Sequence, residues 1–510
     1  MQNDANAVGG EKGINIAEYN LSNRNLWSFS LGGIGRDMAY ALFNTYILTF
    51  ILFTRELTDA QFTAITAIIV VSRIFDAFND PIMGVIVENT RTRFGRFKPW
   101  ILIGAVGCAA VIITVFNSTM GGWEFIAFLA VIYLLFSITF TMNDISYWSM
   151  IPALSRNERD RNKLTSMTIL FSSIGAGIIS ISVPVFTAGS LTLGGSTISA
   201  YKIIAVVTGI MFVACQLMTV SRVKEPVFLD NPDRANLGLK GMFKIIKNND
   251  QTLWIALISL LFNIGNALFT SVSLMYVYFE FNYDGMLTVI FGVLAAVASV
   301  AVNTLYPKIS KRFSKKNLLS SAIVAIVAGY ALMALFGALI PAGEDNQWMI
   351  KFGLMVVAFF FVGYGQSLFY MISMTTFANT VEYNEWKTGE RRESIIFTIR
   401  PFMAKLGSAL LQLVIMFIYL IVGVLQYTNG ISSLEKSANL GKITAEEKLG
   451  EIQNIIESVP EAKKIALILC ITAIPVVFLL SAYFLYRKKI IIDEKFYAKM
   501  LEDISQRKSK

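Results

Sequence analysis

Long apolar segments are the feature of this sequence that most restricts its fold. Twelve of them, of about 20 residues or more, follow one another along the 510 residues, and only 15% of all residues are charged. Soluble domains carry about 25% charged residues. A helix of this length spans the ~30 Å hydrocarbon core of a bilayer and satisfies its own backbone hydrogen bonds there. The sequence therefore predicts an all-α membrane protein with twelve transmembrane helices.

The segments fall into two sets of six. The first set lies near 26–53, 61–87, 99–116, 125–152, 164–186 and 201–220, and the second near 253–279, 287–306, 318–339, 352–380, 395–425 and 465–486. Around them we predict a tail over 1–25, bundles over 26–220 and 251–486, a middle loop over 221–250 and a tail over 487–510. The strings R-F-G-R at 93–96 and R-F-S-K at 312–315 occupy equivalent loops. Parallel halves of this kind are typical of secondary transporters.

The loops predict the orientation in the membrane. Lys and Arg gather in the loops that follow every second span, such as 91–98 and 308–316, whereas the alternating loops are poor in them. Basic loops lie on the cytoplasmic side, so both termini are expected inside a plasma membrane, and a bacterial inner membrane fits best. The exception is 428–464, which carries both signs. We predict a surface helix near 445–458 and interpret this loop as a solvated cap.

Composition excludes several classes of function. The chain contains no histidine, which rules out a His-based catalytic triad, and no enzyme is expected. Its three cysteines lie in apolar segments without metal-ligand spacing, and no cofactor is expected. The net charge of +9 resides in short loops between spans, so lipid headgroups explain it better than nucleic acid.

Four acids and a lysine inside the apolar segments fall near one depth. Asp76 and Asp80 are four residues apart and share one face of a helix. At 1.5 Å per residue, Asp37, Asp80, Asp144 and Lys405 lie at about 14 to 16 Å from the cytoplasmic edge and Asp76 at about 20 Å. Charges at this depth are rare and usually functional. We predict that they meet in a polar cavity; the alternative is that they are unrelated helix-packing contacts.

Neighbouring residues suggest two kinds of ligand. Thr141, Asp144 and Trp148 form one helical stripe, and an aromatic ring beside a carboxylate suits a sugar. Tyr40 and Asn44 extend a similar stripe from Asp37. Oxygen atoms for a monovalent cation are available on a further set of residues, namely Asp76, Asn79, Asp80 and Thr141.

The string D-A-F-N-D-P-I-M-G at 76–84, with R-T-R-F-G-R-F-K-P-W at 91–100 and D-I-S-Y-W-S-M-I-P at 144–152, resembles the glycoside–pentoside–hexuronide:cation symporters. That family belongs to the major facilitator superfamily, so the resemblance implies the major facilitator fold. It implies a site for Na⁺ or H⁺, with Li⁺ as a third option, at Asp76, Asn79, Asp80 and Thr141. It implies sugar-binding or coupling roles for Arg36, Asp37, Asp144, Trp148, Tyr370 and Lys405. The loop residues Arg91, Arg93, Arg96 and Lys98 are assigned to cytoplasmic gating.

One departure from the family concerns the sugar. A family member has a sugar-binding arginine where this chain has Ile169, so the galactoside pattern is incomplete. Arg400 is a candidate replacement that would suit a hexuronide carboxylate. The alternative is that Arg400 lies near the cytoplasmic end and pairs with Glu382, Glu385 or a lipid phosphate. For Lys405 we expect Asp37 or Asp144 as the partner.

The sequence therefore predicts a monomeric cation-coupled symporter of a sugar or glycoside. Two other classes stay open: a lipid or lysolipid carrier on the same scaffold, and a membrane scaffold or sensor that transports nothing. Neither the glycoside nor the coupling cation is specified by the residues.

Replacing either Asp76 or Asp80 by cysteine is expected to abolish cation-driven accumulation, because each change removes a negative charge from the predicted cation site. The protein should still fold into the membrane. Uptake of labelled sugar into vesicles under an imposed cation gradient measures the effect, and normal accumulation by both variants would contradict the assignment.

Overall fold

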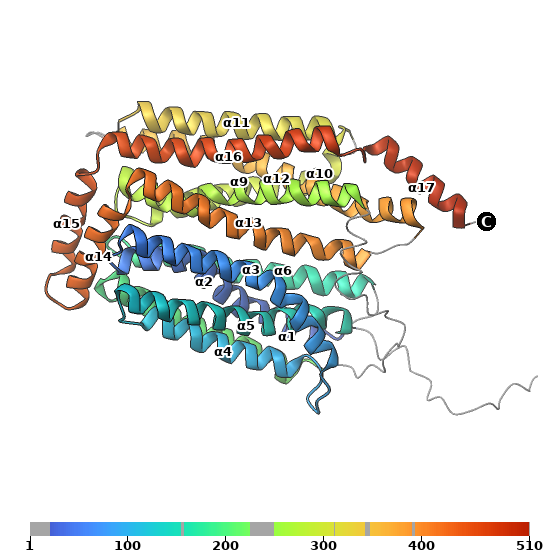
Figure 1. Cartoon of the computed structure of the whole chain (residues 1–510), viewed down its shortest axis with the longest axis horizontal. Coiled ribbons are helices and arrows are strands. Elements are labelled where there is room, and N and C mark those ends of the chain that lie inside the picture. The colour runs from blue at the N-terminus through green and yellow to red at the C-terminus, as the bar shows by residue number, and fades with distance from the viewer. Residues whose placement is uncertain are drawn as a thin grey trace, which may run out of the picture.

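The computed structural model describes residues 21–154, 158–224, 249–310, 312–341, 347–389 and 393–508. Most of the predicted N-terminal tail and middle loop lies outside these residues. The described chain is built from helices, and it contains no strand. Figure 1 shows the long helices running side by side in two groups.

The first half of the chain forms helices α1 (Asn23–Ser30), α2 (Gly32–Thr54), α3 (Asp59–Asn89), α4 (Lys98–Asn117), α5 (Gly122–Leu154), α6 (Glu158–Thr187) and α7 (Thr197–Arg222), with a short 3₁₀ helix η2 (Leu193–Gly195). The second half forms α9 (Asp250–Glu280), α10 (Met286–Ile309), α11 (Lys315–Leu339), α12 (Gln347–Thr388), α13 (Glu393–Val422), α14 (Leu425–Asn439), α15 (Ala445–Glu457), α16 (Glu461–Lys489) and α17 (Glu494–Lys508). Twelve spans in the described chain are long and apolar enough to cross a membrane. The predicted all-α fold with twelve transmembrane helices is confirmed.

Helix α3 shows how local sequence sets the ends of a span. Thr58 caps its start: the hydroxyl accepts from the Gln61 backbone N–H, and the Gln61 side chain accepts from the Thr58 backbone N–H. Such a capping box satisfies two otherwise orphaned donors. Pro81 lies within α3 directly after Asp80. A proline removes one helical hydrogen bond, so the backbone is less firmly held next to the acidic pair.

The two halves meet tightly at the end of the molecule predicted to face outward, which we call the outer end. A Cβ atom added to Gly285 before α10 would lie 1.8 Å from the Pro184 carbonyl oxygen of α6. The ring of Phe53 on α2 lies 5.5 Å from that of Tyr278 on α9. Backbone and aromatic contacts therefore close the outer end between the halves.

The predicted outer loop is more ordered than expected. Its helix near 445–458 is confirmed as α15, but a second helix, α14, precedes it. Figure 1 shows both helices at the outer end, across the ends of the long helices. Ile431, Glu435 and Lys448 are buried here, so the prediction of a merely solvated cap is wrong. The mixed charges suggested exposure, whereas two of them are paired inside the cap.

Two glycines on α6 provide a matched test of helix packing. A Cβ atom at Gly175 would lie 2.2 Å from the Ile34 carbonyl oxygen of α2, whereas one at Gly177 would meet nothing within 4 Å. Gly175→Ala should therefore lower stability by about 1–3 kcal/mol through overpacking. Gly177→Ala should be neutral or stabilising by up to ~1 kcal/mol, because alanine favours the helix. Thermal unfolding in detergent compares the two, and equal melting temperatures would contradict the α2–α6 packing.

Candidate functional site

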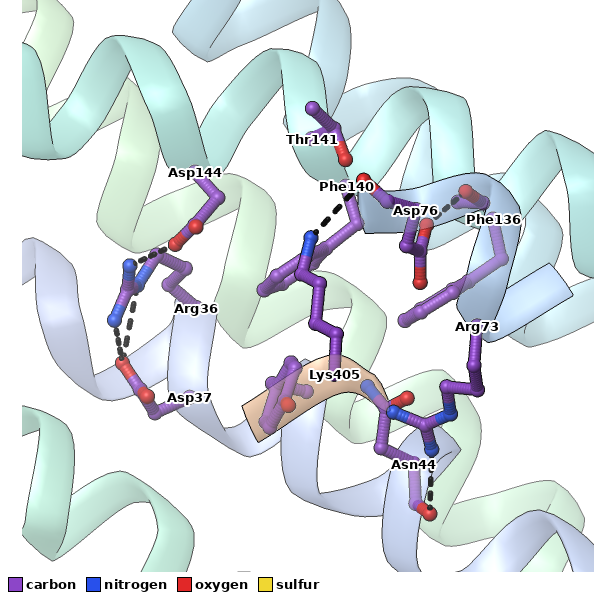
Figure 2. A pocket seen from close by; sticks show the side chains of 12 residues that line it. Arg36, Asp37, Asn44, Arg73, Asp76, Phe136, Phe140, Thr141, Asp144 and Lys405 are labelled. Carbon is purple, nitrogen blue, oxygen red and sulfur yellow. Dashed lines mark hydrogen bonds and ion pairs between the residues drawn. The ribbon is translucent and has the colours of Figure 1, made fainter. Parts of the chain in front are cut away.

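A polar cavity lies halfway along the long helices, where α2, α3, α5 and α13 approach one another. Figure 2 shows its side chains converging from these helices. The residues that line it are Arg36, Asp37, Tyr40, Asn44, Arg73, Asp76, Phe136, Ser137, Phe140, Thr141, Asp144 and Lys405. The structure thus brings Asp37, Asp76, Asp144 and Lys405 together, as their common depth in the sequence suggested.

Arg36 is the central cation of one side of the cavity. Its side chain is only 4% exposed. The guanidinium donates to Asp37 Oδ2 at 2.6 and 3.0 Å and forms an ion pair with Asp144. Because Asp37 lies on α2 and Asp144 on α5, one arginine joins the two helices through two carboxylates. Arginine suits this task because its planar fork presents several donors at once.

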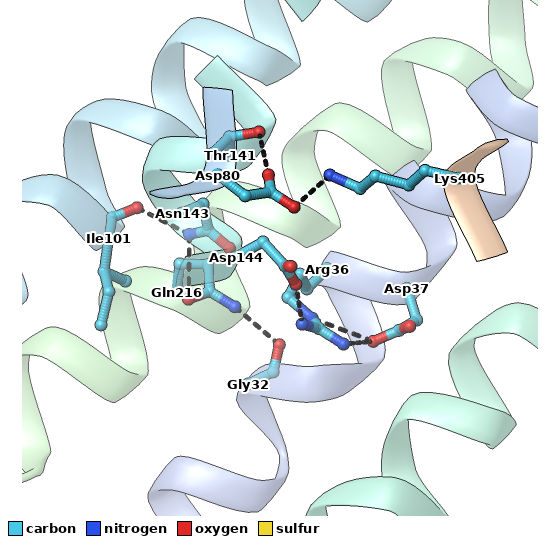
Figure 3. Close-up of polar contacts among 10 residues, drawn as sticks. All are labelled: Gly32, Arg36, Asp37, Asp80, Ile101, Thr141, Asn143, Asp144, Gln216 and Lys405. Atoms are coloured by element: carbon cyan, nitrogen blue, oxygen red, sulfur yellow. Dashed lines mark hydrogen bonds and ion pairs between the residues drawn. The ribbon is translucent and has the colours of Figure 1, made fainter. Parts of the chain in front are cut away.

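Lys405 of α13 holds the other side of the cavity. Its ammonium pairs with Asp80 and lies 3.4 Å from the Asp76 carbonyl oxygen. The Thr141 hydroxyl donates to the second Asp80 oxygen at 3.3 Å (Figure 3). The expected pairing of Lys405 with Asp37 or Asp144 is therefore wrong. Arg36 occupies both of those carboxylates, and the lysine extends to Asp80 on α3, across the boundary between the halves.

Asp76 and Arg73 occupy the third part of the cavity. The Ser137 hydroxyl donates to Asp76. Arg73 is 6% exposed, and its guanidinium donates to the Asn44 carbonyl oxygen at 3.3 Å. Sequence reasoning did not assign Arg73 to the site. Its spacing of three residues from Asp76 would have placed both on one helical face.

The aromatic residues are arranged differently from the sequence expectation. Trp148 does not line the cavity, and its ring instead lies 4.8 Å from the Arg36 guanidinium carbon. Tyr40, Phe136 and Phe140 line the cavity, with the Tyr40 and Phe140 ring centroids 5.2 Å apart. Trp148 is thus placed to orient Arg36, while Tyr40 and Phe140 offer the apolar surface.

Three of the remaining candidates, and Ile169, are not among the residues that line the cavity. Arg400 is exposed and donates to the Tyr370 hydroxyl at 2.7 Å. Neither residue lines the cavity, and neither does the half-buried Asn79. Ile169 on α6 is 51% exposed. The acidic-sugar role of Arg400 and the cation role of Asn79 stay predictions.

The basic loop forms a tight turn between α3 and α4. Gly95 has a φ of 105°, and its backbone N–H donates to the Thr92 carbonyl oxygen at 3.1 Å. The guanidinium groups of Arg93 and Arg96 lie against the rings of Phe94 and Phe97, which fixes their stems. Arg91 donates to the Thr90 carbonyl oxygen at 3.1 Å, and Lys98 begins α4. The gating role of the loop stays a prediction.

Buried amide side chains fix the positions of the helices that surround the cavity relative to one another. Asn143, next to Asp144, donates to the Ile101 carbonyl oxygen at 2.8 Å. Gln216 of α7 donates to the Gly32 carbonyl oxygen at 2.7 Å, one turn before Arg36 (Figure 3). Such fully buried amides position the backbone on either side of the Arg36–Asp144 pair.

The charges of the cavity do not balance. In the described chain, three carboxylates (Asp37, Asp76 and Asp144) and three cations (Arg36, Arg73 and Lys405) line it, and Asp80, which pairs with Lys405, adds a fourth carboxylate to this cluster. With every group ionised, the formal charge is −4 + 3 = −1. Uncompensated charge is expensive inside a membrane protein, so this arrangement favours uptake of one further positive charge.

The Lys405–Asp80 pair can be tested without any ligand. Lys405→Met and Asp80→Asn should each change the stability, and the double variant should differ from their sum by about 1 kcal/mol, because the two partners interact directly. Since both groups are partly exposed, a larger coupling is not expected. Equilibrium unfolding in detergent measures this coupling free energy. Lys405→Met combined with Asp37→Asn is the control and should be additive; coupling there but not with Asp80 would overturn the observed pairing.

Comparison with known proteins agrees with this architecture. A family model described as MFS/sugar transport protein matches residues 28–490. A lactose permease from Lactobacillus helveticus is 28% identical over 81% of this chain, and the match spans 65% of that protein's length, less than two thirds. A raffinose carrier protein from Pediococcus pentosaceus is 23% identical, with 94% of this chain and 71% of that protein covered.

Solved structures support the fold alone. A bacterial homolog of the human lysosomal transporter Spinster superimposes with a TM-score of 0.59 at 14% identity, covering 97% of this chain and 99% of that one. The relatives are transporters and not enzymes, as the sequence predicted. The resemblance carried by the 76–84 and 91–100 motifs is confirmed, and the chain belongs to the MFS/sugar transport family.

Proposed function

We propose that this protein is a cation-coupled sugar symporter. The observation that carries the proposal is the mid-depth cavity between the two halves, with a formal charge of −1 and aromatic surface beside its carboxylates. Substrate and coupling-ion sites of secondary transporters lie at this depth, between repeated halves. The relatives named for lactose and raffinose support a neutral oligosaccharide as the substrate class.

The coupling cation, Na⁺ or H⁺, enters on the acidic side of the cavity. Its proposed ligands are Asp76, Asp80 and Thr141, with Asn79 requiring a rearrangement to join them. In this structure the Lys405 ammonium already occupies Asp80. The ammonium therefore occupies the position at which an incoming cation would be attracted most strongly. In this proposal the cation and Lys405 share the carboxylates of Asp76 and Asp80. Adding one positive charge brings the cavity to neutrality, which lowers the free energy of burying its charges.

The sugar binds on the Arg36 side. Asp37 and Asp144 are oriented by Arg36 and keep oxygen atoms that can accept from sugar hydroxyls. Tyr40 and Phe140 provide a surface for the apolar face of a pyranose ring. In the described chain, Asn44 Nδ2 is a buried donor without a hydrogen-bond partner. A buried donor of this kind fits a ligand oxygen better than an empty cavity.

Because both ligands bind one connected set of charges, each is expected to raise the affinity for the other, as linkage requires. Opening of the cavity first to one side and then to the other moves both across together. A lipid carrier would need a cavity suited to acyl chains, whereas six charged residues line this one and Asp80 pairs with one of them. A scaffold that transports nothing would gain no advantage from buried charges of this kind.

Reconstituted proteoliposomes test the proposal. Uptake of labelled lactose and raffinose is measured under an inward Na⁺ gradient, an inward H⁺ gradient and no gradient. Accumulation under one gradient alone identifies the coupling ion. Uptake without dependence on either cation would refute coupling, and failure to transport any glycoside of a panel that includes glucuronides and xylosides would refute the sugar assignment.

Asp144→Asn is expected to weaken sugar binding by about ten- to hundredfold. The change removes a charged acceptor worth ~1.5–3 kcal/mol per hydrogen bond and loosens the Arg36 clamp. Titration calorimetry with the transported sugar measures the loss. Glu124→Gln is the matched control, because Glu124 is an exposed acid at the opposite end of the same helix. Equal affinities for Asp144→Asn and the parent protein would remove Asp144 from the sugar site.

A further inference from the structure

We propose that the two-helix cap over 425–457 is a latch that holds the outer end closed and must release before the central cavity can open outward. The proposal rests on the alternating access of the proposed function, but the latch can be measured without a sugar. Its hub is the Glu435 carboxylate on α14.

Glu435 is fully buried among polar partners. Its side chain is 0% exposed, and that of its ion-pair partner Lys448 on α15 is 1% exposed, with 3.3 Å between them. Glu435 Oε2 accepts the Thr197 backbone N–H at 2.7 Å, and Oε1 accepts the Tyr283 hydroxyl at 3.3 Å. The Thr197 and Tyr283 hydroxyls lie 3.1 Å apart. Both carboxylate oxygens are thus used by the cluster.

These partners come from both halves of the molecule. Thr197 begins α7 in the first half, whereas Tyr283 lies between α9 and α10 in the second. The cap itself connects α13 with α16 in the second half, and Lys448 also donates to the Gly195 carbonyl oxygen of the first half at 3.1 Å. Glu435 therefore joins elements that alternating access requires to separate at this end.

Two further contacts fasten the cap to the first half. Asn429 of α14 accepts the Leu57 N–H and donates to the Leu57 carbonyl oxygen, both at 2.8 Å, in the link between α2 and α3. Asn439 Oδ1 accepts the Ser199 hydroxyl at 2.9 Å and the Ser196 hydroxyl at 3.2 Å at the start of α7. The cap is therefore held to the first half at three places by directional bonds, beside apolar side chains such as Ile431 and Ile452 that are buried in the core.

The free energy of a buried ion pair makes the Glu435–Lys448 contact better suited to release than to permanent fastening. Burial raises the pKa of Glu435, and Lys448 and the Thr197 N–H oppose that rise. A complete buried ion pair adds little net stability, because desolvation offsets attraction, but removing one partner is costly. When the cap lifts, water can solvate both groups, so opening does not leave a bare charge. A structural fastening alone would be as well served by apolar side chains.

A reversible crosslink tests whether the contact must break. Ser199→Cys and Asn439→Cys are combined in a chain whose three native cysteines, Cys108, Cys215 and Cys470, are replaced by alanine. Oxidation should reduce lactose uptake into proteoliposomes at least ~tenfold, and a reductant should restore it. Either single cysteine serves as the control. Undiminished uptake with the disulfide fully formed would overturn the latch.

A labelling experiment tests the hub without any substrate. Ala188→Cys, in the same cysteine-free background, places a thiol at a position that is 2% exposed, next to the Thr187 carbonyl that accepts the Thr197 hydroxyl. Glu435→Gln should increase its labelling by a membrane-impermeant maleimide from outside by ~tenfold or more, because the outer end opens more often. The double variant Glu435→Gln/Lys448→Met removes the pair without leaving Lys448 unpaired and should act in the same direction.

Glu446→Gln is the matched control, since Glu446 is an exposed acid on α15, and it should leave the labelling rate unchanged. Unchanged labelling in both Glu435 variants would refute the proposal. Faster labelling in a protein that transports no glycoside would leave the latch standing and refute the sugar assignment instead.

Discussion

Charge burial in the middle of the membrane is the constraint on which the rest of this structure depends. Four carboxylates at mid-depth cannot be left bare in a low-dielectric interior. Arg36 joins two of them, Lys405 binds a third across the boundary between the halves, and Ser137 donates to the fourth. The pairing leaves one formal negative charge in excess, and the proposed cation site rests on that excess.

Lys405 forms an ion pair between the two halves. It is the only cavity-lining residue contributed by the second half in the described chain. Its bond to Asp80 lies across the boundary that must move during transport, and a cation that reduces the hold of Asp80 on Lys405 would change the relative free energy of the two arrangements. In the proposed mechanism, coupling is competition between the cation and Lys405 for carboxylates, a differential interaction of the kind that any population shift needs.

The outer cap applies the same physics at a different place. Glu435 and Lys448 are fully buried at the outer end, whereas the acids at the centre are half-buried around a cavity, and each set joins groups from both halves. Directional polar contacts of this type tolerate separation better than packed apolar surface, because water can replace them on opening. A transporter whose halves separate and rejoin would benefit from polar contacts of this kind both at the central cavity and at the outer cap.

Much of this protein is determined by its sequence alone. Apolar segments of membrane-spanning length leave the chain little choice other than helices, and helical spacing places Asp76 with Asp80 and Asp37 with Tyr40 on single faces. The 76–84 string identified the family. Only the tertiary structure decided which charge pairs with which: depth along a helix says that Lys405 can meet several acids, but the lateral arrangement of α2, α3, α5 and α13 gives it Asp80. The same holds for Trp148, which packs on Arg36, and for Glu435, whose burial depends on a contact with Thr197 some 240 positions away in the chain, which no local pattern reports.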